Sequence, residues 1–247
     1  MFGDVSAEAF EPRGRKNVVA RLPELTDADK ASLGARYDEE IAFVDRELGR
    51  LFSYLEEQGL WDHTLVILTS DHGEELFDHG GFEHGHSMFQ EVLRVPLVFW
   101  GPGIPIGRVD EPVSLVDLAP TIYEAVGVKV DDPLSGVSLW ETMLAGERLE
   151  RPEILAQNTL WGREHKAIIS WPYKLIFDPK SGRLQLYDLA MDSLEQQDLA
   201  EDKSVVAKEL ERLLLERLAG LEASPVDPAV VLSEEVEEEL RALGYLD

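Results

Sequence analysis

Four of the six histidines lie in one window of 15 residues that runs from position 72 to position 86. Carboxylates are interleaved with these imidazoles, and the full set is Asp71, His72, Glu74, Glu75, Asp78, His79, Glu83, His84 and His86. Imidazole nitrogens and carboxylate oxygens are donors that bind divalent cations and move protons near neutral pH. The window therefore predicts a metal or acid-base site, and the alternative is a solvated acidic loop with capping histidines.

Asp71, immediately before this window, and His72, its first residue, follow the apolar run 64–69 and Ser70. Together they offer an anionic oxygen and a neutral nitrogen, which suit a divalent cation of hard or borderline character. Adjacent side chains diverge in a regular strand, so both can face one ion only where the chain turns. Gly73 permits such a turn.

His84 and His86 are separated by one residue. In an extended segment their side chains would project to the same side of the chain. Two imidazoles placed in that way could hold a tetrahedral oxyanion, so both are candidate catalytic residues.

The elements before the window predict an α/β arrangement. Thr26 can cap a long amphipathic helix, in which apolar positions recur at intervals of three and four over residues 33–55 and which ends near Gly59. The continuous apolar run 64–69 predicts a strand covered on both faces. Sites in open α/β sheets form just beyond the carboxyl ends of strands, which is where the window begins.

The later part of the chain predicts a second buried strand at 95–100 and a helix at 115–126 that is followed by Gly127. Beyond about Gly146 the apolar runs become shorter, which is typical of an antiparallel meander. Its strands are expected at 165–170, 173–177 and 184–187, and two further helices are expected at 205–218 and 234–243.

Composition excludes several classes of function. The 247 residues carry a formal net charge of -26, which repels nucleic acid phosphates and anionic lipid headgroups, so no nucleic acid partner is expected. No apolar stretch approaches the roughly 20 residues of a membrane span. The absence of cysteine excludes disulfides, thiolate metal sites and any nucleophile derived from cysteine.

Several segments, in order, resemble the sulfatases of the alkaline phosphatase superfamily. The resemblance lies in LWDHTLVILTSDHGEELFDHGG, HGHSMFQEVLRVPLVFWGPG, VSLVDLAPTIYEAVGV, SGVSL and LQLYDLAMDSLEQQDLA, and covers roughly residues 27–200. It implies a partial sulfatase-like α/β fold, with a mixed sheet sandwiched by helices. Residues 1–147 would be the later part of the metallohydrolase domain, and residues 148–247 would be a small α+β carboxyl-terminal subdomain.

The same resemblance implies roles for four residues. Asp71 and His72 would be two ligands of the catalytic divalent metal, which in sulfatases is usually calcium. Manganese or zinc remain alternatives because His72 stands where many members have Asn. His86 or His84 would contact the sulfate or the leaving-group oxygen, and His86 is preferred because it precedes Phe89 by three residues in the segment that leads to RVP.

Sulfatases also carry a Cys/Ser-X-Pro-X-Arg motif that is oxidised to formylglycine, and this chain has no cysteine and no Ser-X-Pro-X-Arg. The motif lies well upstream in the superfamily. We therefore expect the chain to be the carboxyl portion of a longer sulfuric ester hydrolase, inactive alone and completed by the upstream half of the same polypeptide. The substrate would be a small-molecule or saccharide sulfate ester, and the parent protein could be extracytoplasmic, either periplasmic or secreted.

Two other functions stay open at this point. A phosphodiester or phosphonate hydrolase, or a phosphoethanolamine transferase, would use the same scaffold on another tetrahedral oxyanion. A non-catalytic metal-binding or interaction module would retain the scaffold without a nucleophile.

Five other polar residues are expected to have structural roles. Arg94 should form an anchoring ion pair, and Asp117 should cap or orient backbone rather than bind metal. Lys174 should lie on the outward side of a pleated strand. His165 should be a surface histidine and His63 a turn residue.

Overall fold

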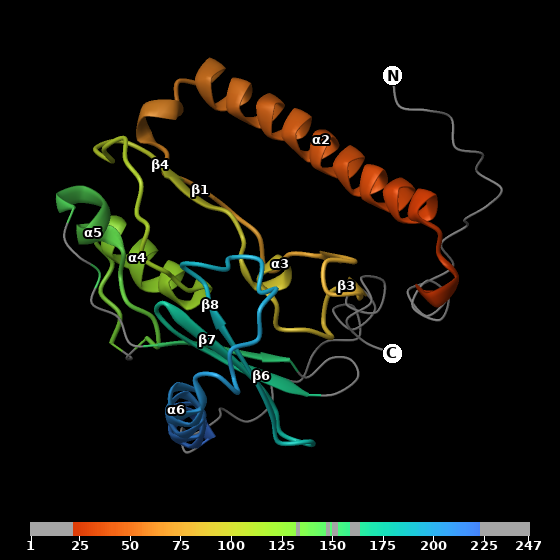
Figure 1. Ribbon diagram of the computed structural model, residues 1–247. Helices are drawn as coiled ribbons and strands as arrows, with labels where there is room; N and C mark the ends of the chain where they lie inside the picture. Colours follow the sequence, from red (N-terminus) through yellow and green to blue (C-terminus); the bar gives the residue numbers. More distant parts are fainter. Residues whose placement is uncertain (1–21, 132–133, 147–148, 150–152, 159–163, 223–247) are drawn as a thin grey trace, which may run out of the picture.

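The structure, a computed structural model, describes residues 22–131, 134–146, 149, 153–158 and 164–222 (Figure 1). After the short 3-10 helix η1 (Leu22–Glu24), helix α2 (Asp27–Glu57) runs along one side of the molecule. Its amino end is the expected capping box: the backbone N–H of Asp29 donates to the Thr26 hydroxyl at 3.2 Å, and the backbone N–H of Thr26 donates to the Asp29 carboxylate at 2.8 Å. The end of the helix near Gly59 is also confirmed, since that glycine follows in the left-handed conformation.

The two apolar runs form strands β1 (Val66–Thr69) and β4 (Leu97–Trp100), which pair antiparallel with Val66 opposite Trp100. The 3-10 helix η2 (Trp61–His63) leads into β1 and places His63 in a turn, as expected. The prediction that β1 is covered on both faces is wrong for the described residues, because Leu68 is 38% exposed and Val98 opposite it is 52% exposed. A strand that is apolar on both faces needs a layer on each, and the described part of the chain does not supply both.

Between these strands lie the short hairpin β2 (Glu75–Leu76) and β3 (Phe82–Glu83) and the one-turn helix α3 (Gln90–Leu93). Arg94, which follows α3, is exposed and forms no ion pair with any other described residue, so the expected anchoring pair is not found there.

Beyond β4, the 3-10 helix η3 (Leu115–Asp117) continues into α4 (Leu118–Ala125), and α5 (Trp140–Ala145) follows. Asp117 is buried and orients backbone as expected: its carboxylate accepts the N–H of Ser114 at 2.8 Å and that of Val137 at 2.9 Å.

The predicted meander is confirmed, with one strand more than expected. Strands β5 (Ile154–Asn158), β6 (His165–Ser170), β7 (Tyr173–Asp178) and β8 (Arg183–Asp188) form an antiparallel sheet in sequence order. Helix α6 (Ser204–Glu222) packs on one face of this sheet (Figure 1). The opposite face meets the segment around α3 in a second apolar cluster of Met88, Ala167, Ile176, Tyr187 and Leu189. The helix expected at 234–243 lies outside the described residues.

Lys174 corrects the expectation of an outward-facing side chain. It is 0% exposed, and its ammonium nitrogen lies 2.7 Å from the Glu195 carboxylate. Helix α6 covers one face of β7 and the segment around α3 covers the other. Side chains in the middle of this strand are therefore buried whichever face they project from. The expectation that His165 is a surface residue is also wrong. This residue is half-buried, because its strand β6 lies between β5 and β7 in the sheet.

Among the described residues, no helix has the length and apolar character needed to cross a membrane.

Candidate functional site

The histidine window occupies the loop after β1 and the β2–β3 hairpin, next to α3 (Figure 1). The hairpin pairs Glu75 with Glu83 and Leu76 with Phe82. Residues ten positions apart, Glu74 and His84, are thereby brought into contact at 2.8 Å. The window therefore folds back on itself, and its polar side chains converge.

Asp71 and His72 face each other at the end of β1. The Asp71 carboxylate is 71% exposed and lies 3.6 Å from Nε2 of His72. Nδ1 of His72 lies 3.0 Å from the carbonyl of Gly73, which can only accept, so Nδ1 donates to it and Nε2 is the ring nitrogen that faces Asp71. Gly73 is required at this turn, because a Cβ there would lie 2.0 Å from the carbonyl oxygen of Glu91.

The donor atoms of this pair fit a single cation. Partial burial opposes ionisation of Asp71, but the neighbouring His72 and backbone N–H groups outweigh it and hold the pKa of this carboxyl below its usual value. A carboxylate oxygen and an imidazole nitrogen 3.6 Å apart can both reach an ion at about 2.0–2.5 Å from each. The hydrogen bond from Nδ1 to a backbone carbonyl is the support that metal-binding histidines usually have.

Glu74 and His84 extend the set of possible ligands. Donor atoms of His72, Glu74 and His84 all lie within 4.8 Å of one another, and the rings of the two histidines are in contact, with centroids 3.8 Å apart and planes tilted by 31°. Two imidazoles and a carboxylate suit zinc or manganese better than calcium, which prefers oxygen ligands. Sequence reasoning did not single out Glu74, because its approach to His84 depends on the hairpin register.

His86 is held by a buried carboxylate. Its Nε2 lies 2.9 Å from Oε2 of Glu75, which is 2% exposed in its side chain. The same carboxylate accepts three other hydrogen bonds, from the Ser87 hydroxyl and from the backbone N–H groups of Gly81 and His79. Burial alone would raise the pKa of Glu75, but these donors lower it below its usual value. Glu75 is therefore ionised, and Nε2 of His86 donates to it.

The segment that carries His84 and His86 is not extended, because Gly85 between them has φ of +78°. The two imidazoles consequently contact different carboxylates, those of Glu74 and Glu75. This geometry places His84 beside His72, and it leaves Nδ1 of His86, the ring nitrogen that does not face Glu75, 3.3 Å from the backbone carbonyl of His84. The catalytic roles of both histidines stay predictions.

His79 lies between α3 and the turn after β8. Its ring is stacked on Phe89 with centroids 3.6 Å apart, its Nδ1 lies 2.7 Å from the Glu91 carboxylate, and its Nε2 lies 3.1 Å from the carbonyl of Glu195. Both partners are acceptors, so the geometry selects the imidazolium. Burial by itself lowers the pKa of His79, but the contacts with Glu91 and Glu195 raise it above its usual value.

This pKa shift predicts how stability depends on pH. Because the pKa of His79 is higher in the folded chain than in the unfolded chain, its stabilising effect is complete below the unfolded value and is lost as pH rises through the folded value. We expect His79→Gln to lower the free energy of unfolding by about 1.5–3 kcal/mol at pH 6 and by clearly less at pH 9. Urea unfolding of both proteins at the two pH values measures the difference. An equal loss at both would contradict a charged His79.

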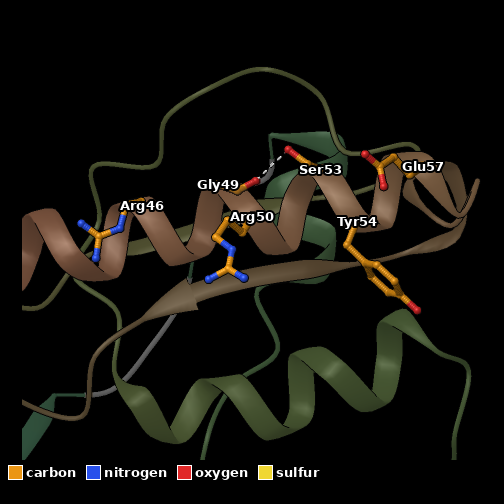
Figure 2. A pocket seen from close by; sticks show the side chains of 6 residues that line it. All are labelled: Arg46, Gly49, Arg50, Ser53, Tyr54 and Glu57. Carbon is orange, nitrogen blue, oxygen red and sulfur yellow. Dashed lines mark hydrogen bonds between the residues drawn. The ribbon is translucent and has the colours of Figure 1, made fainter.

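A hollow on helix α2 contains none of the candidate residues. It is lined by Arg46, Gly49, Arg50, Ser53, Tyr54 and Glu57, whose side chains project from exposed turns of the helix (Figure 2). Within it, the Ser53 hydroxyl donates to the Gly49 carbonyl at 2.9 Å, and Arg50 pairs with Glu47 at 2.6 Å. The polar groups here contact residues of their own helix, so the histidine window is the better candidate site.

Two family models match the chain. The model described as Sulfatase matches residues 6–128, and the model described as N-sulphoglucosamine sulphohydrolase, C-terminal, matches residues 77–224. The chain belongs to the sulfatase family. It therefore has the α/β fold of the alkaline phosphatase superfamily, of which it contains a part.

Curated sulfatases are similar to this chain over much of its length. Arylsulfatase K from Xenopus laevis is 30% identical over 203 residues, which cover 77% of this chain and 38% of that protein. Arylsulfatase K from Bos taurus is 32% identical, with 77% and 37% covered. N-acetylglucosamine-6-O-sulfatase from Bacteroides thetaiotaomicron is 30% identical, with 69% and 32% covered. The chain thus spans less than two fifths of the length of these relatives.

Solved structures have the same fold. A protein in complex with its substrate D-glucosamine-2-N,6-O-disulfate is 28% identical, with a TM-score of 0.66 and coverage of 76% of this chain and 41% of that one. A phosphonate monoester hydrolase from Silicibacter pomeroyi is 25% identical, with a TM-score of 0.67 and coverage of 81% and 43%.

Proposed function

We propose that this sulfatase-family chain is the carboxyl-terminal part of a metal-dependent sulfuric ester hydrolase. The observation that carries the proposal is the facing pair of Asp71 and His72, with donor atoms 3.6 Å apart, in a chain that a sulfatase model matches across this loop. The Cys/Ser-X-Pro-X-Arg motif and the remaining metal ligands would come from a preceding segment of the same polypeptide. This agrees with the small share of the relatives' length that the chain covers.

We propose sulfated saccharides as the substrate class. Support comes from the relative named N-acetylglucosamine-6-O-sulfatase and from the similar protein that binds a glucosamine disulfate as its substrate. The strongly acidic chain would repel a free sulfate ester, so binding requires local positive charge. Protonated His86 and a bound cation are the candidates to supply it.

A divalent cation held by Asp71 and His72 would polarise the sulfate oxygens. The family favours calcium for this cation, whereas the use of Glu74 and His84 as further ligands would favour zinc or manganese. Glu75 keeps a proton on Nε2 of His86, and the ring can carry a second proton on Nδ1. In that form Nδ1–H would exchange its long contact with the His84 carbonyl, 3.3 Å, for a hydrogen bond to an oxygen of the sulfate, or would protonate the leaving alcohol. His84 is the second candidate for this role, because its ring lies against that of His72, one of the proposed metal ligands.

The second candidate function is hydrolysis of a phosphonate or phosphate ester. It is favoured by the likeness to the phosphonate monoester hydrolase and by the reaction centre, which is also a tetrahedral oxyanion. The ratio of kcat/KM for 4-nitrophenyl sulfate to that for 4-nitrophenyl phenylphosphonate decides between the two, since a sulfatase prefers the former.

We expect the purified chain 1–247 to show no measurable hydrolysis of either ester. Electrostatic stabilisation accelerates only a reaction that has an attacking group, and this chain contains neither a cysteine nor Ser-X-Pro-X-Arg. A longer polypeptide that adds a segment with Cys/Ser-X-Pro-X-Arg should be active and should lose activity on Asp71→Ala. Turnover by residues 1–247 alone, abolished by Asp71→Ala, would overturn the proposal that the nucleophile lies outside this chain.

We expect the isolated chain to bind a divalent cation weakly, with a Kd of about 10⁻⁴–10⁻³ M, because only part of the ligand set is present. Calorimetric titration with calcium, manganese and zinc tests this. Asp71→Asn/His72→Ala should abolish the binding. The matched control is Asp62→Asn/His63→Ala, which alters an adjacent Asp-His pair in η2 outside the window. Binding that survives the first double substitution would place the site elsewhere.

A further inference from the structure

Glu195, in the turn after β8, contacts both ends of the segment that carries His84 and His86. Its carboxylate oxygen Oε2 accepts the backbone N–H of Gln90 at 2.6 Å. Its backbone carbonyl accepts Nε2–H of His79 at 3.1 Å. One residue, more than 100 positions further along the chain, therefore fixes residues 79 and 90. Figure 1 shows the turn after β8 passing beside α3.

Glu195 is itself held in place. Its second carboxylate oxygen lies 2.7 Å from the ammonium of Lys174, and both side chains are fully buried. Its backbone has φ of +54°, a left-handed conformation that is uncommon for residues other than glycine. Such a conformation persists only where the surroundings enforce it, and it is often found at functional sites.

A purely structural role does not explain this arrangement well. The apolar cluster of Met88, Tyr187 and their neighbours already joins α3 to the sheet. A buried ion pair adds little net stability compared with apolar side chains of the same volume, because both charges lose their water. The Glu195 carboxylate instead provides directional contacts. It accepts the backbone N–H of Gln90 on α3 and pairs with Lys174 on β7, and thereby fixes the distance between these two elements.

We propose that Glu195 is a positioning residue that sets the location of His84 and His86, with Lys174 as the group that holds its carboxylate. As a statement about catalysis, this rests on the proposed function. As a statement about geometry, it is testable in the chain 1–247 alone.

Two double variants separate positioning from charge. Lys174→Met/Glu195→Gln removes both charges but keeps an oxygen that can accept the Gln90 N–H. Lys174→Met/Glu195→Leu also leaves no unpaired charge but removes the acceptor. Asp198→Asn is the control, because Asp198 accepts the N–H groups of Leu186 and Ala200 in the same region and does not contact residues 79–90.

Amide hydrogen exchange and imidazole NMR signals are the measurements. We expect the Leu variant to exchange the Gln90 amide at least about tenfold faster and to shift the imidazole signals of His84 and His86, with the amides of β6 to β8 unchanged. The Gln variant and Asp198→Asn should leave these signals near their original values. If the Leu variant does not fold, Lys174→Met/Glu195→Ala replaces it. Unchanged Gln90 exchange and imidazole signals in the folded variant, or faster exchange throughout the sheet, would overturn the proposal.

The catalytic part is tested in the longer, sulfate-hydrolysing polypeptide. There the Leu variant should lower kcat/KM by about tenfold or more, and the Gln variant should largely restore it. If the longer polypeptide hydrolyses no sulfate ester, the proposed function fails while the NMR result still stands. Normal kinetics in an active Leu variant would show that Glu195 does not position the catalytic segment.

Discussion

Replacing His86 by Ala is expected to lower kcat/KM for sulfate ester hydrolysis by about 10²–10⁴-fold and to change the melting temperature by only a few degrees. The experiment uses the polypeptide that carries both this chain and the segment with the nucleophile. The large kinetic effect is expected because a hydrogen bond donor to the developing negative charge acts mainly in the transition state. The small stability effect is expected because Glu75 keeps its three other donors after the imidazole is removed.

The control for this variant is His63→Ala, which removes a histidine from the turn before β1, outside the window. It should leave both kcat/KM and the melting temperature near their original values. Near-normal kinetics of His86→Ala with a clearly lower melting temperature would show that His86 is a packing residue. His84, beside His72, would then become the catalytic candidate.

The residues that make up the candidate site could be predicted from the sequence, but the contacts between their side chains could not. A concentration of imidazoles and carboxylates directly after an apolar run identifies the window without a structure. The pairing of His84 with Glu74 and of His86 with Glu75 depends on the β2–β3 register and on the left-handed Gly85. Neither produces a periodic pattern, because the two strands are only two residues long.

Local signals predicted helix ends and strands well. The Thr26 capping box and the glycine after α2 depend on residues a few positions apart, so their energetics are visible in the sequence. The burial of the apolar faces could not be predicted in the same way. The apolar stripe of α2 is present, yet Ile41, Val44 and Leu51 are each about half exposed in the described part of the chain. Sequence periodicity shows which face of a helix is apolar, not what packs against it.

Lys174 shows the same limit for a strand. Alternation in β7 would place one side chain in two toward solvent, but this strand is covered on both faces. The charge is tolerated because Glu195 reaches it from a turn 21 positions further along the chain. No short-range pattern links the two residues, so their contact emerges only from the fold.

Lys174→Met in the chain 1–247 is expected to lower the free energy of unfolding by about 3–5 kcal/mol at pH 8. Met retains most of the volume, so the loss comes from the buried Glu195 carboxylate that is left without its cation. Burial already raises the pKa of Glu195, and loss of the ammonium raises it further. Urea unfolding followed by circular dichroism measures the free energy.

The same variant should be less impaired in mild acid, and the sign follows from linkage. Where the folded pKa of a carboxyl exceeds its unfolded value, stability is highest below the unfolded pKa and falls as pH rises through the folded pKa. The deficit of Lys174→Met relative to the native chain should therefore shrink between pH 8 and pH 5, as Glu195 takes up a proton. The double variant Lys174→Met/Glu195→Leu, which has no buried charge, should recover most of the stability at pH 8 and show no such pH dependence of the difference. A deficit of Lys174→Met that is equal at both pH values, or that persists in the double variant, would mean that lost packing around β7 rather than an uncompensated carboxylate causes the instability.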